Sequence, residues 1–347
     1  MGPAGYAGPV PRGLIIGGTG LLGRATGRRL RAAGGRVDLS GRDPGHLPAD
    51  IAAAEGPFVA ADRDDPGQLL TAPGDGADLL VDCTGYAATD AAALLPLRRS
   101  ADATEMISST AEYVDSAGRH VTSTIAPTFE GPIRERQPTV PPGEGGYAER
   151  KVAAERVLLD DGGPVTVVRP ALLHGAGARM PREWVFVTRA LDRPPVLHLA
   201  QRGAGVVQTT AAATAAALIE AVAARPGRRI LNSADPDALS AREIARTIAR
   251  PLDHVVDELR LDDGADRCPG RPPWDAPHPI VLDMTVAGLV GSIPVGDDTA
   301  TGAEAVGWLV PAARGGADAA ILDQIDGASF GPRRDDAAED RHLAAGG

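Results

Sequence analysis

Short apolar runs bounded by glycine or polar residues alternate with longer amphipathic stretches through most of the 347-residue chain. The apolar runs predict seven β-strands, at 13–18, 36–42, 57–62, 77–85, 105–110, 165–170 and 228–234. Helical periodicity predicts helices over 20–35, near 64–72 and 87–101, and within 144–159. Strands that alternate with helices indicate an α/β fold with a parallel sheet covered on both faces.

A glycine-rich segment, GGTGLLG, joins the first predicted strand to the first helix and places Gly17, Gly20 and Gly23 at G-x-x-G-x-x-G spacing. Such glycines permit a tight turn and a close approach of the backbone to a pyrophosphate, which the N–H groups and dipole of the helix stabilise. A turn that serves only packing is the alternative. The strand–turn–helix context favours dinucleotide binding. The predicted loop contacts also include Thr19, Leu21 and Leu22.

The end of the second strand selects the cofactor, because the adenosine ribose binds there. An acidic residue would accept hydrogen bonds from the ribose of NAD, whereas an arginine suits the 2′-phosphate of NADP. The segment offers Ser40, Gly41 and Arg42, while Asp38 lies too early in the strand. NADP(H) is therefore favoured, with NAD(H) as the alternative. Asp62, which closes the third strand, is placed to meet the adenine amino group.

Tyr147 and Lys151 are four residues apart, so they share one face of a helix. A neighbouring ammonium stabilises a phenolate, which lowers the tyrosine pKa from about 10 and allows proton exchange near neutral pH. Such a pair is common by chance. However, Lys151 is the only lysine among the 35 basic Lys and Arg residues of the chain. Its retention at this position favours a catalytic pair.

The glycine motif, the segment SST (108–110) and YAERK (147–151) together resemble the extended short-chain dehydrogenase/reductase superfamily, in its NAD(P)-dependent epimerase/dehydratase branch. The resemblance covers most of 12–310 and includes VVRPALLHG and NSADPDALSAREIA. It implies a Rossmann-type doubly wound parallel sheet with a smaller, discontinuous C-terminal substrate domain. The implied ranges are 11–170 and 204–231 for dinucleotide binding, 171–203 and 232–330 for substrate binding, and 1–10 and 331–347 for flexible tails.

The resemblance also implies a Ser/Thr–Tyr–Lys catalytic set. Tyr147 matches the family tyrosine, and Lys151 matches the lysine that also binds the nicotinamide ribose. Thr110 best matches the hydroxyl residue that hydrogen-bonds the substrate oxygen. Because the aromatic residue of SSTAEYVD lies one place earlier than usual, Ser109 is the alternative. A purely structural role for both hydroxyls, at the end of a strand, is the remaining interpretation.

Further contacts are expected from strand ends and from segments that match the family. Cofactor contacts are predicted for Cys83, Thr84, Gly85, Lys151, Arg169 and Pro170, although the apolar run around Cys83 also fits a core residue. Substrate contacts are predicted for Tyr86, Glu112, Arg202 and Trp274. The substrate region also holds His174, Arg179, Arg182, Trp184, His198, Arg271 and His278, for each of which packing is the alternative.

Two departures from the family pattern narrow the range of substrates and reactions that the sequence supports. Gln208, Thr209 and Thr210 stand where sugar-nucleotide enzymes carry acidic residues, which disfavours a nucleotide-sugar substrate. The Asp-Glu pair that dehydratases carry after the catalytic threonine is replaced by Ala111 and Glu112. A general acid for elimination is therefore missing at its usual position.

Composition excludes several partners. The net charge of −11 argues against sequence-independent nucleic-acid binding. Two cysteines, Cys83 and Cys268, give no disulfide framework, and neither they nor the histidines have a metal-ligand spacing. The most apolar helical stretch is too short to span a membrane and contains Glu220. The N-terminus has no signal-peptide pattern. We therefore expect a cytoplasmic protein without metal, nucleic-acid or membrane partners.

The sequence thus predicts an NADP(H)-dependent oxidoreductase that transfers hydride between nicotinamide and a carbonyl or alcohol of a small metabolite. One alternative is an epimerase or dehydratase that uses bound NAD(P) transiently. Another is a non-catalytic dinucleotide sensor. A homodimer is expected from the family resemblance alone.

Overall fold

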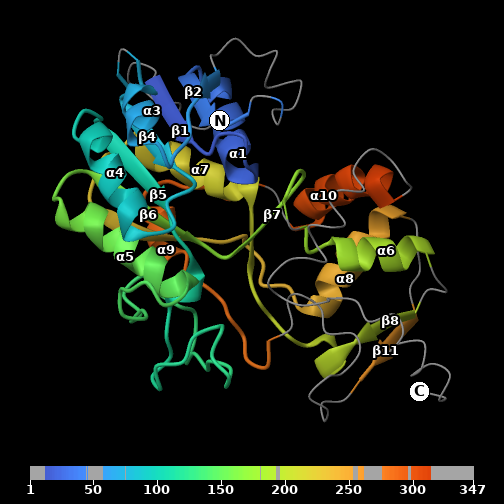
Figure 1. Cartoon of the computed structure of the whole chain (residues 1–347). Helices are drawn as coiled ribbons and strands as arrows, with labels where there is room; N and C mark the ends of the chain where they lie inside the picture. Colours follow the sequence, from blue (N-terminus) through green and yellow to red (C-terminus); the bar gives the residue numbers. More distant parts are fainter. Residues whose placement is uncertain are drawn as a thin grey trace.

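The computed structural model describes residues 12–43, 45, 58–74, 76–179, 181–192, 196–252, 257–261, 276–295 and 298–313. A seven-stranded parallel sheet forms its centre, with the strand order β10-β6-β5-β4-β1-β2-β3 (Figure 1). Its strands are β1 (Arg12–Ile16), β2 (Arg36–Gly41), β3 (Phe58–Ala60), β4 (Leu79–Asp82), β5 (Ala103–Ile107), β6 (Val165–Pro170) and β10 (Arg229–Ser233). The strand order reverses between β1 and β4, and ligands of such sheets bind at that point.

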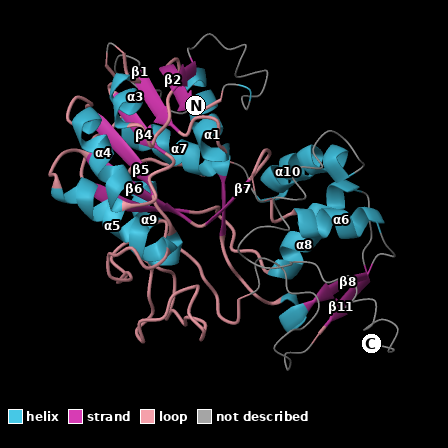
Figure 2. Ribbon diagram, viewed as in Figure 1, coloured by secondary structure: helices cyan, strands magenta, loops and turns pink. Residues whose placement is uncertain are grey.

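Helices cover both faces of this sheet (Figure 2). One face carries α1 (Leu21–Ala32) and α7 (Ala212–Ala223), and the other carries α3 (Pro66–Thr71), α4 (Ala88–Arg98) and α5 (Tyr147–Asp160). Neighbouring residues of β1 show the alternation. Ile15 packs in the core with α1 and α7, while Leu14 and Ile16 pack in the core with α3, α4 and α5. Because both faces are buried, most strand positions are apolar, and polar residues within the strands, such as Asp38 in β2 and Glu105 in β5, are buried as well.

All seven predicted strands are present, and the predicted α/β doubly wound fold is confirmed. One boundary differs in a way that matters for the site. The strand predicted at 105–110 runs from Ala103 to Ile107, and the chain then enters a 3-10 helix, η2 (Thr110–Glu112). Ser109 leaves the sheet because its side chain caps this helix.

A smaller group of elements lies beside the sheet (Figure 1). It contains α6 (Trp184–Asp192), α8 (Ala241–Ala249), α10 (Asp298–Ala313), η3 (Ala200–Gly203), η4 (Arg250–Leu252) and the parallel pair β8 (Val196–Leu199) and β11 (Asp257–Arg260). Val187, Ile248 and Leu309 share its core. A second parallel pair, β7 (Leu172–His174) and β9 (Thr209–Ala211), lies between the two groups.

The elements of the smaller group come from both segments that were predicted to bind substrate, whereas β9 lies in the range predicted for dinucleotide binding. Helix α9 (Thr285–Leu289) falls within 232–330, yet Ala287 packs in the core under α7 on the central sheet. The predicted tails, 1–10 and 331–347, lie outside the described residues, as does 314–330. None of the helices in the described ranges is both long and apolar enough to cross a membrane.

Candidate functional site

The loop between β1 and α1 has the geometry of an anion cradle. Gly17 has a φ of +76°, and a Cβ there would lie 2.4 Å from Cγ2 of Thr84. A Cβ at Gly23 would lie 2.4 Å from the carbonyl oxygen of Gly17. Helix α1 begins after Gly20, and it has no side-chain cap and no acidic residue in its first turn. The first N–H groups of α1 are therefore open to an anion, and the loop fits the pyrophosphate of a dinucleotide.

The remaining predicted loop residues differ in exposure. Leu22 is buried in the core, so only its backbone N–H could serve a cofactor. Thr19 and Leu21 are half-buried. A Cβ at Gly175 would lie 3.5 Å from the side chain of Leu21, so the segment after β7 lies over the start of α1.

The end of β2 lies beside the glycine loop. Ser40 is buried, and its carbonyl accepts the N–H of Gly18 at 2.8 Å. Arg42 follows the strand, is exposed, and forms no ion pair within the described part of the chain. Asp38 is buried and paired with Arg12 at 3.3 Å, which removes it as a ribose ligand. Asp62 follows β3, and its carboxylate accepts the N–H of Asp64 at 3.1 Å.

Helix α5 begins at Tyr147, and the Ser109 side chain lies near enough to the Tyr147 hydroxyl to act on its pKa. The oxygen of Ser109 accepts the N–H of Ala111 at 3.1 Å, which leaves its O–H free to donate toward Tyr147. Thr110 instead begins η2. The structure favours Ser109 over Thr110, because the Ser109 side chain is the one that acts on the Tyr147 hydroxyl.

Lys151 lies one turn further along α5 and is 2% exposed. Its ammonium donates to the carbonyl of Gly85, after β4, at 2.7 Å and to the carbonyl of Ile107, at the end of β5, at 2.8 Å. It lies 4.5 Å from the ring centroid of Tyr86 and 5.9 Å from that of Tyr147. Burial lowers its pKa to about 8, against the opposing effect of Asp82 and Glu112. The ammonium thus links two strand ends to the aromatic pair.

The pKa of Tyr147 differs from the sequence-based expectation. The residue is 45% exposed, but its hydroxyl lies in dense surroundings, and desolvation raises its pKa to about 12. The Ser109 side chain acts in the opposite direction and has the smaller effect on this pKa. In the protein without ligands, the neighbouring ammonium therefore does not bring the phenol near neutral pH. The expectation that it does was wrong for this state.

Sequence reasoning missed an ion pair at the point where the strand order reverses. Arg63 donates to both carboxylate oxygens of Asp82, at 2.8 and 2.7 Å, and Asp82 is 1% exposed. Thr84 joins the pair by donating its N–H to Asp82 at 2.9 Å. The signal available in the sequence for this ion pair was an acidic residue at the last position of β4, beside the glycine loop. The pair fixes the turn that presents Gly85 to Lys151.

Three predicted ligand contacts are corrected by burial. Glu112 is 0% exposed and lies 3.2 Å from the Nε of Arg169, so its carboxyl group faces the interior and not a substrate. Arg169 is 3% exposed and binds Glu155, with Nε–O and Nη2–O distances of 2.8 and 2.5 Å. Pro170 is buried at the end of β6. Arg169 and Pro170 therefore support the site from behind and do not contact a cofactor through their side chains.

The other predicted residues fall into separate groups. Cys83 and Thr84 lie against Gly17, and Tyr86 is exposed with its ring centroid 6.4 Å from that of Tyr147. Arg202 lies in η3 of the smaller group, where its N–H donates to the carbonyl of Leu261. Trp274 and Arg271 lie outside the described residues.

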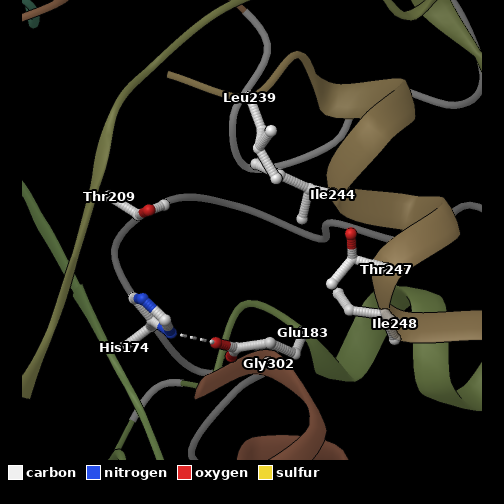
Figure 3. Close-up of a pocket in the computed structure, with 8 residues that line it drawn as sticks. All are labelled: His174, Glu183, Thr209, Leu239, Ile244, Thr247, Ile248 and Gly302. Carbon is white, nitrogen blue, oxygen red and sulfur yellow. Dashed lines mark ion pairs between the residues drawn. The ribbon is translucent and has the colours of Figure 1, made fainter. Parts of the chain in front are cut away.

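A separate cavity of about 30 Å³, with a largely apolar surface, lies where β7 and β9 meet α8 and α10 (Figure 3). His174 lies between two carboxylates there, with its Nε2 2.8 Å from Asp235 and its Nδ1 3.6 Å from Glu183. This volume holds about one or two water molecules, and neither Tyr147 nor Lys151 lines it. The cavity therefore lies at the junction between the two groups of elements, apart from the catalytic candidates.

Comparisons with known proteins agree with this arrangement. The family model of the NAD dependent epimerase/dehydratase family matches residues 13–233. A search of curated proteins found no match. Among solved structures, an epimerase from Methanothermobacter thermautotrophicus has a TM-score of 0.68 at 15% identity, with 89% of this chain and 95% of that chain covered.

Two further structures were determined with the cofactor. The Bordetella bronchiseptica enzyme WbmH in complex with NAD+ has a TM-score of 0.66 at 16% identity, covering 86% of this chain and 98% of that one. The dTDP-glucose 4,6-dehydratase from Bacillus anthracis in complex with NAD has a TM-score of 0.65 at 16% identity, covering 86% and 96%. With a seven-stranded Rossmann-type sheet and a family model that spans well over half of its length, the chain belongs to the NAD-dependent epimerase/dehydratase family of extended short-chain dehydrogenase/reductase enzymes.

Proposed function

We propose that this enzyme is an NADP(H)-dependent oxidoreductase that acts on the alcohol or carbonyl group of a small metabolite. The observation that carries the proposal is the arrangement of Ser109, Tyr147 and Lys151. The Ser109 side chain lies beside the Tyr147 hydroxyl and acts to lower its pKa, and the only lysine of the chain lies 5.9 Å from the centroid of the Tyr147 ring. A phenol supported by a second hydroxyl and a cation is suited to giving or taking the proton of a substrate oxygen.

Each residue has a distinct part in this reaction. The nicotinamide, when bound, supplies or accepts the hydride. Ser109 donates its O–H to the substrate oxygen and keeps it beside Tyr147. Tyr147 transfers the proton to or from that oxygen. Lys151 lies next to the phenol as a cation, and this charge favours the phenolate once the substrate and cofactor complete the site.

The choice of NADP over NAD rests on the end of β2. Arg42 is exposed directly after the strand, and Gly41 has no side chain to compete with a phosphate. A charge-assisted contact of this kind is worth roughly 1.5–3 kcal/mol, which corresponds to about a 10- to 150-fold preference. Titration of NADPH and NADH by fluorescence tests it. Arg42→Gln should weaken NADPH binding and leave NADH binding unchanged, and equal affinities in the wild-type protein would contradict the assignment.

A transient use of the cofactor is the second candidate. It is favoured by the epimerase and dehydratase names of the similar structures and of the family model. A substrate screen that follows nicotinamide absorbance separates the two functions. Net reduction consumes one NADPH for each product, whereas an epimerase converts substrate with no net change in the cofactor. Product formation without cofactor consumption would replace the proposed function with the second candidate.

A further inference from the structure

The 3-10 helix η2, which Ser109 caps, is held by a buried carboxyl group. Oε1 of Glu112 accepts the N–H of Ser109 at 3.1 Å and the O–H of Ser108. In return, the Ser109 oxygen accepts the N–H of Ala111. This reciprocal capping box fixes the backbone and the hydroxyl rotamer of the residue that reaches Tyr147.

The charges in direct contact with Glu112 do not balance if both nearby acids are ionised, because Lys151, a further cation that acts on Glu112, forms no ion pair with it and donates to two backbone carbonyls. Glu112 and Glu155 are 0% and 2% exposed, and both lie against one cation, Arg169. The single Nε proton of Arg169 is directed to Glu155 at 2.8 Å, while Oε2 of Glu112 lies 3.2 Å from the same nitrogen and has no hydrogen-bond donor. The guanidinium also stacks on the Tyr113 ring at 4.9 Å. An ionised Glu112 would be a second, unneutralised buried charge.

A proton on Oε2 of Glu112 removes the surplus buried charge and gives this oxygen a hydrogen bond to make. The protonated oxygen becomes a donor, and the Glu155 carboxylate, which contacts the same Nε of Arg169 at 2.8 Å, lies beside it as the acceptor. Arg169, Glu155 and the neutral Glu112 then carry one positive and one negative charge among them, on Arg169 and Glu155. Burial, followed by the nearby charge of Glu155, raises the pKa of Glu112 well above its ordinary value, in agreement with this count.

We propose that Glu112 is a positioning residue, a neutral carboxylic acid that donates to Glu155, accepts from Ser108 and Ser109, and thereby holds the Ser109 hydroxyl against Tyr147. The part of this inference that concerns turnover rests on the proposed function. The protonation state of Glu112 does not depend on the proposed function, because it can be measured in the protein alone.

Infrared difference spectroscopy tests the neutral acid without any substrate. Subtraction of the Glu112→Gln spectrum from the wild-type spectrum should leave a protonated carboxyl C=O band near neutral pH that shifts in D₂O. Glu105→Gln is the matched control, because Glu105 is a second buried acid whose pKa burial raises well above its ordinary value. It should remove a different band. A carboxylate band in place of the carboxyl band for Glu112→Gln would overturn the proposal.

Kinetics test the positioning role. A glutamine keeps the acceptor for Ser109 and the donor for Glu155, so Glu112→Gln should keep kcat within about threefold of the wild type. Glu112→Leu removes both, and its kcat should fall by about tenfold or more with KM for the cofactor unchanged. In a Ser109→Ala background, Glu112→Leu should lower kcat no further, because the two residues act as one unit.

Several results would contradict this role. A folded Glu112→Leu protein with wild-type kcat would show that Glu112 does not position Ser109. The same conclusion would follow if the Ser109→Ala, Glu112→Leu double variant lost kcat by the product of the two single losses. If Glu112→Leu does not fold, the decision passes to Glu112→Gln, for which a large loss of kcat in a folded protein overturns the proposal. Absence of turnover in the wild-type protein with every substrate would count against the proposed function, while the infrared result would still decide the state of Glu112.

Discussion

Replacement of Lys151 by methionine should change the pH dependence of stability in one defined window. Methionine keeps the length of the side chain and removes its charge. Lys151 is 2% exposed, and burial lowers its pKa from 10.5 to about 8. A shift of this size corresponds to about 3 kcal/mol of free energy, at 1.36 kcal/mol per unit.

The sign follows from proton uptake. Between about pH 8 and pH 10.5 the unfolded chain binds a proton at Lys151 that the folded protein has already lost, so the free energy of unfolding rises with pH there. Below about pH 8 both states are protonated, and the folded state carries the full penalty of a buried charge. Above about pH 10.5 both are neutral and the penalty is absent. The wild-type protein should therefore gain about 3 kcal/mol relative to Lys151→Met across this window.

At pH 7 the two proteins should have similar stability. The variant avoids burying a charge, but it leaves the carbonyls of Gly85 and Ile107 without the ammonium that donates to them at 2.7 and 2.8 Å. Each such bond contributes about 1.5–3 kcal/mol, so the two changes largely offset each other. Loss of activity in Lys151→Met at pH 7 would then not reflect unfolding.

The assay is urea denaturation of both proteins from pH 6 to pH 11. Arg150→Met, which removes a half-buried cation from the neighbouring position of α5, is the control and should give a curve parallel to the wild type. Because Lys151 is the only lysine, no other lysine titrates in this window. Parallel curves for the wild type and Lys151→Met would refute the reasoning, since they would mean that folding does not perturb the ammonium.

Other substitutions have equally direct outcomes. Ser109→Ala should lower kcat by on the order of 10²-fold without weakening cofactor binding, while Thr110→Val should have a smaller effect; the reverse order in steady-state kinetics would return the role to Thr110. Gly23→Ala places a Cβ 2.4 Å from the Gly17 carbonyl and should abolish dinucleotide binding in a fluorescence titration, whereas Gly131→Ala, with open space around it, should bind normally. Lys151→Arg should lower the melting temperature, because a larger group must enter a filled space at a cost of about 1–3 kcal/mol, and its kcat/KM should fall by on the order of 10²-fold; near-normal activity would mean that charge alone suffices.

The fold was predictable because a parallel sheet buried on both faces leaves a strong local pattern. Most strands are short, mainly apolar runs, and the glycine loop directly follows the first run and opens a stretch with helical periodicity, as in a strand–turn–helix unit. Tyr147 and Lys151 were likewise predictable, since they share one helix face regardless of what the helix packs against. In these cases the residues that determine the structure lie within a few positions of one another.

The site residues that were predicted wrongly depend on distant parts of the chain. The residues next to Glu112 in the sequence do not determine whether its carboxyl group faces solvent or Arg169. The packing of β6 against η2 determines this orientation. The choice between Ser109 and Thr110 depends on where β5 ends. The apolar pattern suggests a strand through 110, but the cap formed by Ser109 stops it earlier and changes which hydroxyl meets Tyr147.

The contacts of Lys151 give a physical reason why a chain that otherwise uses arginine keeps lysine there. Its ammonium donates to carbonyls at the ends of two neighbouring strands, β4 and β5, and lies against two aromatic rings. A tetrahedral ammonium can direct its three protons to three different sides, whereas a guanidinium donates only in its own plane. With two protons held by Gly85 and Ile107, one remains for a ligand. The same two bonds that fix the position of the ammonium therefore leave it with a single free donor beside Tyr147.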